Sequence, residues 1–209
     1  MMATADAYLE VPETFPALKQ TLSGFLPFAA TFAVVGWIWF EHYLFFLHFK
    51  LQDNLTVFLN LVLLFVVLFF AYPLKFVLTR LVGGWTGYGL PQASPDFTGF
   101  TAADARLLMV AYSAGFVAVF TILALFYWIA LRKREELGLG ALEVFDARGG
   151  LRRHLLSVVI GAASIVLALV VPMRLFWMPG FIYFLLGPVQ GVNGHRNGMA
   201  RARLEASLA

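Results

Sequence analysis

Long apolar segments constrain this chain more than any other feature. We expect helices over residues 22–46, 55–78, 105–131, 154–171 and 175–189. A hydrocarbon core of about 30 Å takes about 20 helical residues to cross, whereas the strands of a membrane barrel are about 9–11 residues long and alternate in polarity. Residues 55–78 are apolar at consecutive positions over many turns, so helices are expected. The shortest segment, 175–189, is interrupted by Pro179, Gly180 and Pro188, and a tilted or interfacial helix is the alternative to a span there.

Composition supports a membrane protein. The chain is 61% hydrophobic and 13% charged, with a mean hydropathy of +0.81, whereas soluble domains carry about 25% charged residues and about 45–50% apolar ones. The expected fold is therefore an all-α, polytopic helical bundle of about five transmembrane helices, forming a single domain over residues 1–209.

Several functional classes lack support in the sequence. Cys is absent and the formal charge is only +3, without a basic stripe, so neither a disulfide framework nor nucleic-acid binding is indicated. We find no phosphate-binding glycine loop, no H-E-x-x-H motif and no serine–histidine–acid arrangement. The sequence therefore predicts neither an enzyme nor a bound cofactor.

The basic residues predict the orientation. Residues 132–153, expected as a loop, and the polar tail 190–209 hold nine of the fifteen Lys and Arg residues. In a five-span arrangement both regions lie on the same side, which the positive-inside rule makes cytoplasmic. The N-terminus and the loop 83–99 then lie outside. An exterior N-terminus without a signal peptide suggests a further helix before residue 1.

The stretch "GWIWFEHYLFFLHFK" places ionisable groups among aromatic ones. Glu41 and His48 are two turns apart, about 10 Å along a helix, too far to bind one metal ion together. We therefore expect no metal site. The preferred interpretation is that Glu41, His42 and His48 mark the interfacial end of a spanning helix, within an aromatic belt.

Asn60 lies inside the apolar segment 55–78. A buried amide in a membrane helix needs partners, so Asn60 is expected to face another helix and form hydrogen bonds with it. The alternative is a polar patch beside an ion path.

The stretch from Phe32 to Pro73 resembles the lysosomal-type potassium channel family, particularly its bacterial branch. The family's W-x-x-H-H-x-x-x-F-like pattern and D…N spacing correspond here to Trp39, His42, Tyr43, Phe46, Asp53 and Asn60, with Tyr43 replacing the second histidine. The later basic residues also fit, with Arg132 to Arg134 ending one helix and Arg152 and Arg153 opening the next.

The resemblance implies a homo-oligomer, tetrameric in the family, in the bacterial plasma membrane, with the lipid bilayer and potassium or other monovalent cations as partners. Its pore has a hydrophobic constriction that dewets. Trp39, His42 and Asn60 would brace the pore helix, and Tyr43 and Asp53 are weaker candidates. The family layout has six helices, and the first carries R-x-x-x-F-S-D, a signature absent from residues 1–209. No selectivity-filter residue is therefore named. Either that helix precedes this sequence, or the protein is a non-conducting scaffold or accessory subunit.

Overall fold

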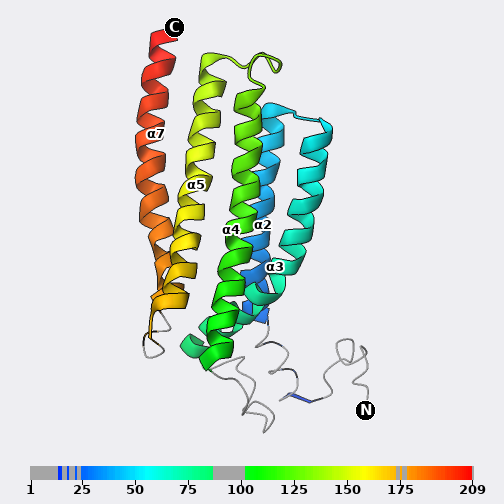
Figure 1. Ribbon diagram of the computed structural model, residues 1–209, viewed down its shortest axis with the longest axis vertical. Coiled ribbons are helices and arrows are strands. Elements are labelled where there is room, and N and C mark those ends of the chain that lie inside the picture. The colour runs from blue at the N-terminus through cyan, green and yellow to red at the C-terminus, as the bar shows by residue number, and fades with distance from the viewer. Residues whose placement is uncertain are drawn as a thin grey trace.

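A computed structural model describes residues 14, 15, 18, 22, 25–86, 102–172, 175 and 178–208. Its elements are α2 (Phe25–Phe49), α3 (Asn54–Thr86), α4 (Ala102–Arg132), α5 (Ala141–Val170), α6 (Met178–Phe181), a 3₁₀ turn (Ile182–Leu185) and α7 (Leu186–Leu208). The long helices lie side by side, with α7 at one edge of the bundle next to α5 (Figure 1). The part of the chain that the structure describes contains no strand, which confirms the predicted helical bundle.

Four described helices are long and apolar enough to cross a membrane. They are α2, residues Asn54–Thr79 of α3, residues Arg106–Arg132 of α4, and α5. The connections 50–53 and 133–140 and the C-terminal end of α7 all lie at the same end of the bundle (Figure 1). We call this the basic end, because Lys50, Arg132 to Arg134, Arg201 and Arg203 gather there.

The core surrounds α4, which packs between α5 on one side and α2 and α3 on the other. Its centre is aromatic: Phe45 and Phe126 are fully buried and their rings stack at 5.3 Å. Gly150 lets α5 approach α4 closely, because a Cβ at this position would lie 2.2 Å from the ring of Tyr127 on α4. Deeper in the bundle, Ser113 of α4 and Ser164 of α5 share a hydrogen bond of 2.9 Å.

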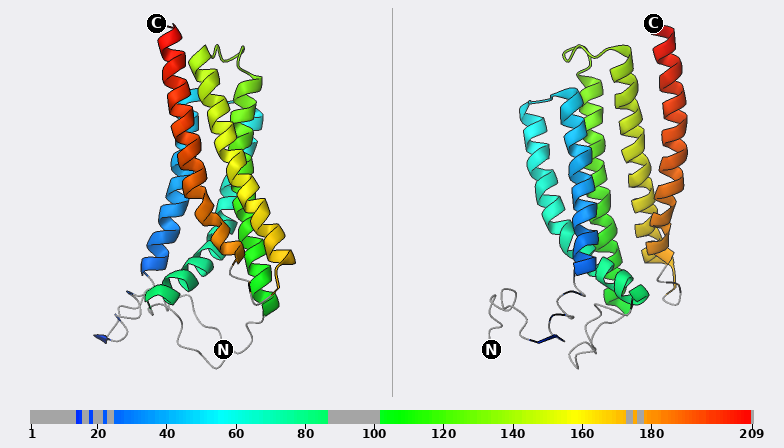
Figure 2. Two further views of the ribbon diagram at one scale, coloured as in Figure 1. Left: turned by 90° about the vertical axis from the view of Figure 1, so that its left-hand side faces the viewer. Right: turned by 180° about the vertical axis from the view of Figure 1, so that it is seen from behind.

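α3 is longer than the predicted segment 55–78. It continues past Pro73 to Thr86 and changes direction in its lower part (Figure 2). A proline inside a helix removes one backbone hydrogen bond and clashes with the preceding turn, so it kinks the helix without always ending it.

The predicted loop 132–153 is largely helical, and this prediction needs correction. α5 begins at Ala141, thirteen residues before the predicted start at 154. Gly138 turns the chain with a φ of 62°, and the Glu143 carboxylate accepts a hydrogen bond of 2.7 Å from the Gly140 backbone N–H. This side-chain cap satisfies a helix-terminal donor, so the charged residues that follow belong to the first turns of α5.

The predicted fifth span, 175–189, is also wrong as a continuous helix. In its place are the four-residue α6, the 3₁₀ turn and the start of α7, which then continues through the tail 190–209 as far as Leu208. α7 is mainly polar, and none of its described residues is fully buried. The expected exterior N-terminus and loop 83–99 lie outside the described residues, apart from the end of α3 within that loop.

Candidate functional site

The structure brings together the three residues predicted to brace a pore helix. The His42 Nε2 atom lies 2.8 Å from Asn60 Oδ1, which joins α2 to α3. An amide oxygen only accepts hydrogen bonds, so His42 donates from Nε2 in this arrangement. The Trp39 ring stacks on the His42 ring, with 4.8 Å between their centroids and 22° between their planes.

Aromatic neighbours fix the His42 ring on its other sides. The Phe46 ring lies 4.7 Å away, and the Phe126 ring of α4 meets it edge-on at 6.0 Å. Trp39 is nevertheless 62% exposed. His42 and Asn60 are only half-buried, so this polar pair lies close to the outer surface of the protomer.

Tyr43 and Asp53 lie outside this cluster. Tyr43 is exposed on α2. Asp53 precedes α3, where its Oδ1 accepts a hydrogen bond of 3.2 Å from the Thr56 backbone N–H and its Oδ2 receives one of 2.8 Å from the Lys133 ammonium. The Lys133 hydrogen bond and the Thr56 hydroxyl lower the pKa of Asp53. Asp53 therefore caps α3 and ties the connection 50–53 to the end of α4.

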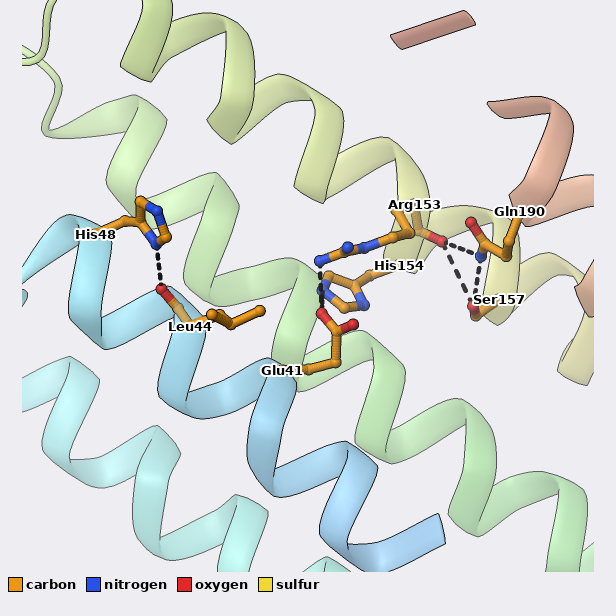
Figure 3. A network of polar contacts seen from close by, with 7 residues as sticks. All are labelled: Glu41, Leu44, His48, Arg153, His154, Ser157 and Gln190. Atoms are coloured by element: carbon orange, nitrogen blue, oxygen red, sulfur yellow. Dashed lines mark hydrogen bonds and ion pairs between the residues drawn. The ribbon is translucent and has the colours of Figure 1, made fainter. Parts of the chain in front are cut away.

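A second polar cluster, which the sequence did not predict, joins α2 to α5. The Glu41 carboxylate is buried and accepts a hydrogen bond of 2.5 Å from Arg153 (Figure 3). His154 is 1% exposed, and its Nε2 lies 3.9 Å from the same Glu41 oxygen. Glu41 is therefore buried and paired between two helices, a contact that its interpretation as an interfacial residue did not include. His48 is exposed, with its Nδ1 2.7 Å from the Leu44 carbonyl oxygen.

The Glu41 cluster extends to α7. Gln190 donates from Nε2 to the Arg153 carbonyl oxygen at 2.9 Å and to the Ser157 hydroxyl at 3.0 Å (Figure 3). Nearer the basic end, Arg201 of α7 pairs with Asp146 at 2.9 Å. The polar residues of α7 thus bind it along α5.

These contacts hold helices in register and present no chemistry for a bond-breaking reaction. Among the described residues, no group of three or more His, Asp or Glu side chains lies close enough to hold a metal ion. Glu41 and Arg153 are 112 residues apart in sequence. Only Glu41 stood out, as a charge among aromatic residues, whereas Arg153 belonged to a basic segment expected as a loop. Buried charges are normally paired, so Glu41 signalled that a partner exists without identifying it.

Comparisons with known proteins agree with this architecture. The family model for the endosomal/lysosomal potassium channel TMEM175 matches residues 3–70. A protein of Marivirga tractuosa described as a potassium channel is 36% identical over 200 residues, which cover 93% of this chain and 81% of that protein. A crystal structure of a variant of the potassium channel MtTMEM175, in complex with a nanobody–MBP fusion protein, matches with a TM-score of 0.77 and 34% identity. That match covers 91% of this chain and 84% of the other.

These relatives are channels, not enzymes, and their likeness extends over nearly the whole chain. Together with four helices able to cross a bilayer, they make this an integral membrane protein. The chain belongs to the TMEM175 family of endosomal/lysosomal-type potassium channels.

Proposed function

We propose that this protein conducts potassium in preference to other monovalent cations, through a pore that several copies form together. The observation that carries the proposal is the 36% identity, over 93% of the chain, to a protein described as a potassium channel. A tetramer with a hydrophobic constriction is the arrangement that the family resemblance implies.

The exposed side of the His42–Asn60 pair supports an assembly. Polar groups at membrane depth are costly when they face lipid, so they normally face protein or a water-filled cavity. Trp39 is exposed beside this half-buried pair. We therefore place a pore helix, or a neighbouring copy, against Trp39, His42 and Asn60. In this arrangement the three residues position that helix and do not contact ions.

The basic end gives the orientation within this proposal. Cytoplasmic segments are rich in Lys and Arg, and both the connection 133–140 and the end of α7 carry them. The C-terminus is then cytoplasmic, in a bacterial plasma membrane.

Ion flux in liposomes tests the function. Purified protein is reconstituted into liposomes with an outward potassium gradient. Potassium flux is followed without any added potassium ionophore, and empty liposomes give the baseline. We expect potassium flux well above that baseline and a clear loss of flux in His42→Ala, but not in His48→Ala on the same helix. Flux no higher than in empty liposomes, from protein that is folded by circular dichroism, would overturn the proposal. That result would favour a non-conducting scaffold or accessory subunit.

A further inference from the structure

The outward face of α5 combines two arginines with an apolar groove. Arg148, Arg152, Leu155 and Val159 follow one another at spacings of four, three and four residues, which places them on one side of the helix. Together with Leu151 and Leu156 they line a shallow groove of about 240 Å³. Leu155 and Val159 are 48% and 64% exposed.

No carboxylate among the described residues neutralises the arginines of this groove. Arg148 is exposed and forms no ion pair with any described residue. Arg152 donates a hydrogen bond of 2.9 Å to the neutral amide oxygen of Asn197. The nearby acid Asp146 is already engaged by Arg201. The groove therefore presents two positive charges without a counter-ion from the protomer.

The two arginines lie close to the basic end of α4. Gly150, between the two arginines, packs against Tyr127 of α4. Tyr127 is five residues before the end of α4 at Arg132, which corresponds to about 7–8 Å along the axis. Farther from the basic end the same face of α5 continues with exposed apolar side chains, including Val166. Arginine side chains at this depth reach toward the headgroup region.

We propose that Arg148 and Arg152 bind the phosphate of an anionic phospholipid, whose acyl chain lies along Leu155 and Val159. Guanidinium groups match phosphate oxygens with paired hydrogen bonds, and basic residues at a helix surface favour anionic headgroups. The charge of the two arginines selects the anionic headgroup, and the apolar groove holds the acyl chain below that headgroup. The inference rests on the chain being embedded in a membrane and is independent of whether it conducts.

Lipid binding to the intact protein tests this assignment. Protein purified in mild detergent is titrated with phosphatidylglycerol or phosphatidylcholine, and bound lipid is counted by native mass spectrometry. We expect phosphatidylglycerol to bind more tightly than phosphatidylcholine. Arg148→Gln with Arg152→Gln is expected to weaken phosphatidylglycerol binding about tenfold or more, because each basic residue contributes about 1 kcal/mol toward an anionic surface. The charge-keeping variant, Arg148→Lys with Arg152→Lys, is expected to retain much of that binding.

The matched control is Arg196→Gln with Arg203→Gln. It removes the same charge from exposed positions of α7 outside the groove and is expected to bind phosphatidylglycerol as the unmodified protein does. Equal binding of both lipids, or an equal loss in the control, overturns the proposal. Displacement of the lipid by millimolar inorganic phosphate also overturns the proposal, because the face would then be a site for free phosphate. Dissociation of the oligomer in the Gln variant overturns it as well, because the face would then be a subunit contact.

Discussion

At the scale of single residues, the hydrogen bond between His42 and Asn60 is a testable link between α2 and α3. Interhelical hydrogen bonds in membrane proteins average about 0.6 kcal/mol and reach about 1.7 kcal/mol. In a double-mutant cycle of His42→Ala and Asn60→Ala, we expect a coupling free energy in this range. Equilibrium unfolding in detergent measures it. His48→Ala is the control, since His48 is exposed on the same helix and its hydrogen bond goes to the Leu44 carbonyl of that helix and not to α3. A coupling free energy near zero would show that the bond contributes nothing to stability.

Asp53 predicts how stability depends on pH. Its pKa lies below the ordinary value of 3.8, because the Lys133 ammonium and the Thr56 hydroxyl donate hydrogen bonds to its carboxylate. The resulting stabilisation is complete above pH 3.8 and is lost as the pH falls through the lowered pKa. The same hydrogen bond raises the pKa of Lys133 above its ordinary value of 10.5. The stabilisation from the charged Lys133 is therefore present below pH 10.5 and is lost as the pH rises through the raised pKa.

Asp53→Asn isolates the charge, because Asn also caps helix N-termini well. We expect the variant to melt at a lower temperature than the unmodified protein at pH 7, with the difference shrinking toward pH 3. The measurement is the thermal midpoint of each protein at both pH values. A difference that is as large at pH 3 as at pH 7 would contradict the role of the carboxylate charge.

The residue scale also shows how far sequence reasoning reached. The resemblance singled out Trp39, His42 and Asn60, and they do lie in contact. Their role beside a pore stays a prediction. Sequence reasoning assigned Glu41 to the interface, because helical spacing describes neighbours within one helix and not a partner on α5. A pairing over 112 residues depends on how helices pack, which periodicity does not encode.

At the scale of elements, two glycines predict opposite responses to the same substitution. A Cβ at Gly150 would meet the ring of Tyr127, which is held between Phe45 and Phe49 at ring distances of 5.0 and 5.7 Å. We expect Gly150→Ala to cost about 1–3 kcal/mol of unfolding free energy, as overpacked cores do. At Gly191 in α7 a Cβ would meet nothing within 4 Å.

Gly191→Ala is therefore the matched control, and we expect it to be neutral or to stabilise by up to about 1 kcal/mol, since Ala is the better helix former. Denaturant titration of both variants measures the difference. If Gly150→Ala is as stable as Gly191→Ala, α4 and α5 do not depend on this close contact.

The elements themselves were predictable in proportion to their apolar length. Sequence reasoning located the first four helices because each contains a long apolar run, although it began α5 too late by treating charge as a sign of a loop. The cap from Glu143 to Gly140 was the available signal. The prediction of one continuous helix over 175–189 was wrong, because prolines break the apolar run there. The polar α7 is stabilised by contacts with α5, such as Arg201 with Asp146, more than by hydrophobicity.

At the scale of the whole molecule, the position of the basic end predicts which side of the membrane each connection faces. The chain contains no Cys, so a single introduced Cys reports one position. Gln52 belongs to the connection 50–53 and Gly138 to the connection 133–140, and both connections lie at the basic end of the bundle (Figure 1). We expect Gln52→Cys and Gly138→Cys to resist a membrane-impermeant maleimide in intact cells and to react after permeabilisation, because Lys- and Arg-rich connections stay in the cytoplasm. Ser94→Cys, which the sequence predicts to be exterior, is the control expected to react in intact cells. Labelling of the first two positions without permeabilisation would invert the topology and place the arginines of α5 at the opposite leaflet.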